Sequence, residues 1–208
     1  MSKISSSNKS RIRLLTAVTQ LLDSGAETTK ITITDVVTTA GLTRPTFYAT
    51  FDDLPAAFAA AALARLEDAF TGLTNDPTIP RHQQMRENFT VILMRLAEHS
   101  DFFACVLRGP GSILVQERVV EFVTSRLQAH SPLSTALAAG ALPLEMTSSA
   151  LAAGVTWTVI RWLDQDPQVT VPELAAQLSE YLESAVLSGL GNEPAPSGAH
   201  ENTNGVVS

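Results

Sequence analysis

Apolar residues recur at spacings of three and four through most of this chain, with polar residues filling the positions between them. This period predicts amphipathic α-helices, and no alternating pattern typical of a strand stands out. The chain is therefore predicted to be all-α, with about nine helices. The expected helices span residues 11–23, 32–40, 43–51, 54–73, 81–99, 101–108, 112–128, 145–164 and 171–190.

Proline and glycine indicate where these helices end. Two prolines interrupt residues 75–80, a Gly-Pro-Gly turn follows residue 108, and an Asp-Pro pair separates the last two helices. Residues 131–143 are ambiguous, and we interpret them as a short helical extension. Residues 192–208 are polar and lack periodicity, so we expect a disordered tail there.

A stretch near the N-terminus carries the signals of two short helices joined by a tight turn. Thr32 followed by Asp35 is the capping-box pattern of a helix start. Gly41 stands where a helix end commonly needs a left-handed residue. Thr43 can cap the second helix, and Pro45 lies in its first turn, where a missing N–H does little harm.

The second short helix has an apolar and a polar side. Phe47 and Phe51 are i, i+4 partners and define the buried side, whereas Pro45 and Ala49 point away from them. Tyr48 lies on the flank, and the outward side has no carboxylate. This pattern is typical of a helix-turn-helix, which places its second helix in the major groove of DNA. The alternative is a plain helical hairpin on the surface of a bundle.

Residues 11–58 resemble the DNA-binding domain of the TetR family of bacterial transcriptional regulators. The resemblance rests on a leading amphipathic helix that ends in Asp-Ser-Gly, on the segments ITITDV, AGLT and PTFY, and on Phe51. The rest of the chain is similar to the family only in its helical layout.

The resemblance implies DNA-binding roles for residues of the two short helices. Arg44 and Pro45 occupy positions that touch base edges, where arginine can pair with guanine and proline can lie against a thymine methyl. The positions that mostly hold phosphates are Thr32, Thr34, Thr43, Thr46, Tyr48 and Thr50. Family members usually carry a lysine shortly after the final aromatic residue, but this chain has Asp52 and Asp53 there. These aspartates suit a helix start and put negative charge near the DNA.

Charge is distributed unevenly along the 208 residues. The whole chain carries −7, yet residues 1–51 hold six basic and three acidic side chains, which gives +3. Only the DNA-facing part of a regulator needs positive potential, and an acidic body discourages unspecific contact with nucleic acid. The basic residues before residue 14 are interpreted either as a flexible arm that reaches phosphates or as a solvated terminus.

The last two predicted helices are apolar on more than one face. Val155 and Val159 illustrate this on the first helix, as do Leu178 and Leu182 on the second. A helix that is apolar almost all round needs cover on both sides. The resemblance implies that both helices pair with their twins from a second subunit in a four-helix interface. The alternative is that they fill the core of a monomer.

The resemblance also implies a pocket for a small apolar effector among the middle helices. Trp157 and Arg161 are i, i+4 partners and would offer an apolar wall with one charged anchor. Plain core packing is the alternative role for each candidate. The candidate ligand-binding residues are Phe89, Leu93, Phe102, Phe103, Leu107, Phe122, Met146, Trp157 and Arg161.

The sequence carries no pattern that favours an enzyme. The four histidines stand far apart, no glycine-rich phosphate loop precedes a lysine, and no serine lies in a nucleophile elbow. We therefore expect no catalytic residue, no metal site and no cofactor. The single cysteine, Cys105, excludes an intrachain disulfide and favours a reducing cytoplasm. Neither a signal peptide nor a membrane-spanning segment is expected.

These features together predict a homodimeric transcriptional regulator, in this family most often a repressor, that binds a near-palindromic operator and is released by an effector. The expected organisation is a DNA-binding domain over residues 1–53, an effector-binding and dimerisation domain over 54–191, and the tail. The alternative is a helical ligand- or partner-binding protein that has lost operator recognition.

Overall fold

The computed structural model describes residues 2–164 and 169–190, and this part of the chain forms ten α-helices and no strand. The all-α prediction is confirmed. The predicted tail and the Asp-Pro pair before the last helix lie outside the described residues. The helices are α1 Ser2–Asp23, α2 Ile33–Ala40, α3 Arg44–Tyr48, α4 Leu54–Ala69, α5 Arg81–Ala97, α6 Ser100–Arg108, α7 Ser112–His130, α8 Ser134–Ala138, α9 Leu144–Asp164 and α10 Val171–Leu190.

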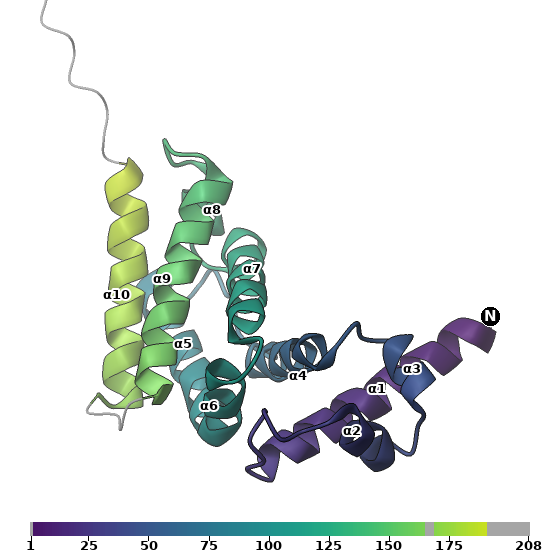
Figure 1. Ribbon diagram of the computed structural model, residues 1–208. Coiled ribbons are helices and arrows are strands. Elements are labelled where there is room, and N and C mark those ends of the chain that lie inside the picture. Colours follow the sequence, from purple (N-terminus) through teal and green to yellow (C-terminus); the bar gives the residue numbers. More distant parts are fainter. Residues whose placement is uncertain (1, 165–168, 191–208) are drawn as a thin grey trace, which may run out of the picture.

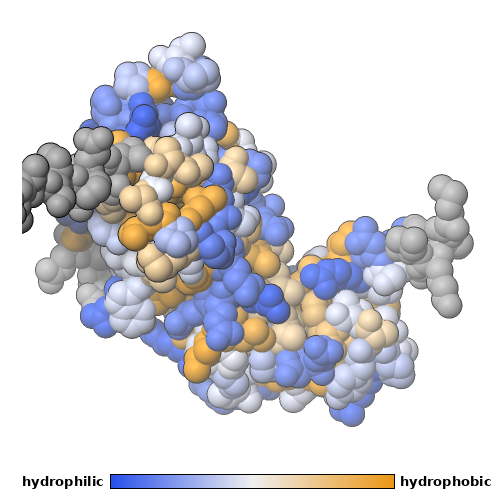
Figure 2. All heavy atoms as spheres, turned by 90° about the horizontal axis from the view of Figure 1, so that it is seen from above, coloured by the Kyte–Doolittle hydropathy of each residue, from blue (hydrophilic) through white to orange (hydrophobic). Residues whose placement is uncertain are grey.

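The molecule has a small head, made of α1 to α3, and a larger body, made of α4 to α10 (Figure 1). Helix α4 leads from the head into the body, and α9 and α10 lie side by side along the edge of the body farthest from the head. Seen from above, head and body are two lobes, largely polar, with apolar residues gathered on part of the body (Figure 2). Within the described ranges no helix has the length and apolar character that crossing a membrane requires.

Three helix boundaries differ from the sequence-based prediction by three residues or more. Helix α1 begins at Ser2 rather than residue 11, so the prediction of a flexible or solvated segment before it is wrong. Once a helix has nucleated, each further residue adds a hydrogen bond at little cost, so it extends beyond its buried part. Helix α4 ends at Ala69 rather than residue 73, because Gly72 adopts a left-handed conformation with φ 75°. Helix α3 ends at Tyr48 instead of residue 51.

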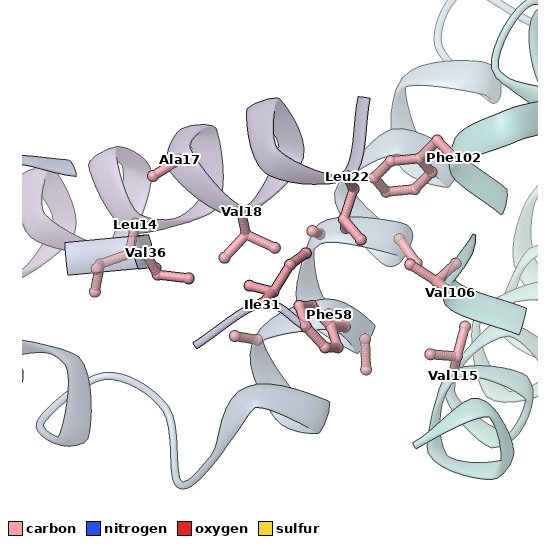
Figure 3. Close-up of a cluster of buried hydrophobic side chains, with 14 of the residues drawn as sticks. Leu14, Ala17, Val18, Leu22, Ile31, Val36, Phe58, Phe102, Val106 and Val115 are labelled. Atoms are coloured by element: carbon pink, nitrogen blue, oxygen red, sulfur yellow. The ribbon is translucent and has the colours of Figure 1, made fainter. Parts of the chain in front are cut away.

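One hydrophobic cluster joins the head to the body. Leu14, Val18 and Leu22 of α1 are buried together with Val36 of α2 and Phe58 of α4 (Figure 3). The same cluster continues into α5, α6 and the start of α7. The head therefore shares its core with the neighbouring body helices. A shift of α4 or α6 would change the packing of α1.

A second hydrophobic cluster fills the other side of the body. Leu174, Leu178, Leu182 and Val186 of α10 are buried in it, and α10 packs along α5 of the same chain. The sequence analysis predicted that α10 is apolar on more than one face and pairs with its twin from a second subunit. These residues pack within their own chain, and the predicted pairing with a second subunit would have to use the other faces of α10.

A partly exposed ion pair ties α1 to α4 where both meet α6. The Arg65 guanidinium donates to both carboxylate oxygens of Asp23, at 2.6 and 2.9 Å, and lies 4.2 Å from the centre of the Phe102 ring. The hydrogen bonds from Arg65 lower the pKa of Asp23, against the opposing effect of desolvation. The ion pair therefore favours the ionised carboxylate in the folded state.

We expect this ion pair to make the protein sensitive to acid. A carboxyl group with a lowered folded-state pKa stabilises the fold above its unfolded pKa, and this stabilisation disappears as the pH falls through the folded-state value. The Asp23 side chain is 43% exposed, so solvent screening limits the effect to about 1 kcal/mol. Urea denaturation between about pH 5 and pH 3 should show a weaker pH dependence for Asp23→Asn than for the native protein. The exposed control Glu117→Gln should follow the native curve, and identical slopes for all three proteins would contradict the expectation.

Candidate nucleic-acid interface and internal cavity

Helix α2 and the turn after it are held by local hydrogen bonds. The Thr32 hydroxyl accepts from the Asp35 N–H at 3.2 Å, and the Asp35 carboxylate accepts from the Thr32 N–H at 2.8 Å. This confirms the predicted capping box. Gly41 ends the helix in a left-handed conformation with φ 59°, and its carbonyl accepts from the Arg13 guanidinium at 3.1 Å. The angle between α2 and α3 is therefore set by residues of the turn and of α1.

Helix α3 comprises the five residues Arg44–Tyr48. Thr43 is its N-cap residue, and Pro45 lies in its first turn, as predicted. The predicted capping role of the Thr43 hydroxyl is wrong, because that hydroxyl is hydrogen-bonded to the Thr46 hydroxyl, 3.0 Å away, and not to a backbone N–H.

Two phenyl rings support α3 from behind. Phe47 is fully buried and Phe51 nearly so, with their ring centres 5.8 Å apart, which confirms the predicted buried side. Tyr48 is 57% exposed, and Arg44 and Pro45 are also exposed. The helix therefore presents an arginine, a proline and a tyrosine to solvent on a rigid base.

The threonine hydroxyl groups predicted to hold phosphates already have partners within the chain. The Thr32 hydroxyl donates to the Asp35 carboxylate at 2.7 Å, and the Thr50 hydroxyl donates to the Thr46 carbonyl at 2.9 Å. The Thr34 hydroxyl accepts from the Arg44 guanidinium at 2.6 Å. The Thr34 hydroxyl therefore keeps its own proton to donate to an external acceptor, and so does one hydroxyl of the Thr43–Thr46 pair. The hydroxyls of Thr32 and Thr50 already donate within the chain and would have to reorient before they could donate to a phosphate.

Asp52 and Asp53 follow Phe51, against whose ring a basic side chain packs. Asp53 caps α4, since its carboxylate accepts from the Ala56 N–H at 2.8 Å, which confirms the predicted helix start. The Arg11 guanidinium lies 5.3 Å from the centre of the Phe51 ring, one residue before Asp52. Arg11 thus supplies a cation at this end of the head.

The body encloses a cavity of about 470 Å³ between α4, α5, α6, α7, α9 and α10. Its walls are mostly aliphatic and aromatic, with Leu66 and Phe70 of α4, Val119 of α7 and Val159 of α9 among them. Such a volume and lining are typical of sites for small organic molecules.

Four of the residues predicted to bind a ligand line this cavity and five do not. Those that line it are Phe89, Leu93, Phe103 and Leu107. Phe102 is buried beneath Arg65, Phe122 packs edge-on against Phe70, and Met146 and Trp157 are exposed on α9, as is Arg161. The predicted anchor pair of Trp157 and Arg161 therefore lies on the outer surface of α9, because both residues follow the helix face opposite Thr156 and Val159.

Among the polar residues of the cavity wall that sequence reasoning missed are Arg126 of α7 and Thr156 of α9. Both carry a buried polar atom, Arg126 Nε and Thr156 Oγ1, for which the structure gives no hydrogen-bond partner. The signal for Arg126 was present in the sequence. It stands seven residues after Val119 and three after Val123, on the inward stripe of α7.

Close backbone contacts link the cavity walls to the head. A Cβ atom on Gly109, in the turn between α6 and α7, would lie 2.2 Å from the Thr28 hydroxyl before α2. A Cβ atom on Gly111 would lie 2.6 Å from Pro55 at the start of α4. The turn between α6 and α7 therefore packs closely against Thr28 of the head and against Pro55 at the start of α4.

Solved structures with this fold are known from transcriptional regulators. The TetR family repressor AlkX from a Dietzia species, implicated in the biodegradation of n-alkanes, is 20% identical, with a TM-score of 0.56 over 86% of this chain and 96% of its own. A TetR-family transcriptional regulator from Streptomyces coelicolor is 17% identical, with a TM-score of 0.57 over 91% of this chain and 92% of its own. No protein-family model and no curated protein matches the sequence.

These similarities extend over nearly the whole chain and include both the head and the body. The resemblance inferred from the helix-turn-helix segment is thereby confirmed at the level of the fold. The described helices have the architecture of TetR-family transcriptional regulators.

Proposed function

We propose that the protein is a homodimeric transcriptional regulator that binds a near-palindromic operator and leaves it when a small molecule enters the body cavity. In this family such regulators are most often repressors, and we propose that role here, in the cytoplasm. The observation that carries the proposal is the exposed tip of α3, with Arg44, Pro45 and Tyr48 outward over the buried Phe47.

Helix α3 of each subunit would enter a major groove. Arg44 would exchange its contact with the Thr34 hydroxyl for a guanine edge, and Pro45 would lie against a thymine methyl. Thr34, Tyr48 and the Thr43–Thr46 pair would donate to phosphates. Arg11 would take the place of the family's lysine, since it lies beside Phe51 at the same end of the head.

Dimerisation would use the outer surface of α9 and α10. Met146, Ala153 and Trp157 of α9 are exposed there, together with Tyr181 of α10. The Tyr181 hydroxyl lies across α9, 3.0 Å from where a Cβ atom on Gly154 would stand. Small and aromatic residues on adjacent exposed helices are typical of a surface that a partner covers.

Effector release would be a two-state change. A ligand among the cavity walls would favour a different spacing of α6 and α7. The contacts of Gly109 with Thr28, and of Gly111 with Pro55 at the start of α4, would pass this change in spacing to the head. The ligand can do so only if it binds the non-DNA state more tightly than the DNA-bound state.

Two substitutions on α3 should have distinguishable effects on DNA binding. Tyr48→Ala should weaken binding to all sequences, whereas Arg44→Ala should mainly relax the preference at one base position, by about 1–3 kcal/mol. Gel-shift titrations on the operator and on its single-base variants measure both effects, with Gln20→Ala, an exposed change on α1, as the control. Native affinity and preference in both α3 variants would contradict this docking.

The proposal as a whole is tested by selecting bound sequences from a random DNA pool with the purified protein. Two inverted half-sites separated by one or more helical turns are expected, with affinity that falls steeply as salt rises. Recovery of no enriched sequence would instead support the alternative of a helical ligand- or partner-binding protein without operator recognition.

A further inference from the structure

We infer that the body cavity takes an amphipathic carboxylate, an apolar molecule with a single anionic head that is held by Arg126 and Thr156. The inference rests on the proposed effector site and specifies the chemical class of its ligand. It replaces the small apolar effector, with Arg161 as its charged anchor, that the sequence alone suggested.

Arg126 carries a charge that nothing in the described part of the chain neutralises. Its Nε is buried without a hydrogen-bond partner, and no described carboxylate forms an ion pair with its guanidinium. The guanidinium lies 5.6 and 5.4 Å from the ring centres of Phe70 and Phe122. Cation–π contacts stabilise the guanidinium of this half-buried residue only in part, because its Nε is out of contact with water and has no hydrogen-bond partner.

Thr156 provides a second unsatisfied group on the wall contributed by α9. Its side chain is only 6% exposed, and its hydroxyl has no hydrogen-bond partner. A buried hydroxyl normally finds a partner, commonly a backbone carbonyl of its own helix. Two unsatisfied polar groups, from two helices, thus belong to residues that line the same mostly apolar cavity.

The charge of the residues that line the cavity decides the sign of the charge on its ligand. Among the described residues that line it, the ionisable side chains are Arg126 and His130, one helical turn apart on α7, and neither Asp nor Glu is present. The Arg126 guanidinium would attract an anion and repel a cation, and no carboxylate of the lining would offset that repulsion.

A carboxylate fits this site better than a phosphate. The Nε–H and one Nη–H of arginine form parallel donors that match the two oxygens of a carboxylate. One guanidinium neutralises the single carboxylate charge, whereas a phosphate dianion would keep an excess charge in an apolar cavity. The aliphatic walls would then surround the hydrocarbon body.

Direct binding measurements test this assignment without DNA. Calorimetric titration of the purified protein would use octanoate, decanoate and dodecanoate, each beside its methyl ester, which has nearly the same body and no charge. We expect at least one acid to bind about tenfold or more tightly than its ester, because a hydrogen bond to a charged group is lost in the ester.

Variants of the two polar residues identify the anchor. Arg126→Met should reduce the affinity for the acid by about 10- to 100-fold and leave the ester unchanged, and Thr156→Val should give a smaller loss of the same kind. Arg118→Met, an exposed change on the same helix, should bind like the native protein. Unfolding midpoints of all variants show that the fold is kept.

The outcomes separate this inference from the proposed regulator. Equal binding of acids and esters, no binding of any acid, or an unchanged preference in Arg126→Met would overturn the carboxylate assignment, whatever the DNA experiments show. Tight acid binding through Arg126 that leaves a gel-shifted operator complex intact would uphold the assignment and contradict effector release.

Discussion

Ala153→Glu is expected to separate the proposed dimer and to remove tight operator binding. Ala153 is exposed on the outer face of α9, one turn before Trp157. In a dimer, the new carboxylate would be buried against its own symmetry copy, and burying like charges without partners is strongly unfavourable. A monomer loses the gain from holding two half-sites at once, so operator affinity should fall by at least about 100-fold.

Analytical ultracentrifugation and gel-shift titration measure the two parts of this result. Ser125→Glu adds the same charge to the exposed face of α7 and should leave both mass and affinity unchanged. An Ala153→Glu protein that sediments like the native protein as a dimer would show that another surface joins the subunits. A native protein that sediments as a monomer at the concentrations used for DNA binding would contradict the dimer itself.

Phe47→Ala is expected to destabilise the head by about 3–5 kcal/mol, the range for removing a large buried aromatic side chain. Phe47 is fully buried and contacts both Phe51 and Tyr48. The ring is the inner support of a five-residue helix, which has little stability of its own. Operator binding should be lost together with the folded head.

The neighbouring Tyr48→Ala is the matched control, because it removes an aromatic ring from the exposed side of the same helix. Urea denaturation followed by circular dichroism should show a large loss of unfolding free energy for Phe47→Ala and little change for Tyr48→Ala. A loss below about 1 kcal/mol for Phe47→Ala would mean that the ring does not support α3 as described.

The helix-turn-helix was predictable in detail because its determinants are local. The capping box of Thr32 and Asp35, the left-handed Gly41 and the i, i+4 pair of Phe47 and Phe51 each act within a few residues. Local hydrogen bonds and backbone preferences can therefore be predicted from residues close together in the sequence. The Thr43 hydroxyl was misassigned because a side chain three residues away, Thr46, offered a competing partner.

The cavity was predicted far less completely. Phe89 and Leu93 line it, but Trp157 lies on the outside of α9 and Arg126 was overlooked. Periodicity tells that a helix has an apolar face, but which of several apolar faces meets the cavity depends on how five other helices pack around it. For the same reason, the sequence did not show which apolar face of α10 packs on α5 of its own chain.

By itself, the sequence determined the all-helical class, the helix-turn-helix and the buried side of its second helix, since helix periodicity, caps and turns are short-range effects. Only the tertiary structure decided that α10 packs on α5, that the head shares a core with α4 and α6, and that Arg126 and Thr156 line one cavity. These features join residues far apart in the chain. They follow from the packing of whole helices, which no local pattern specifies.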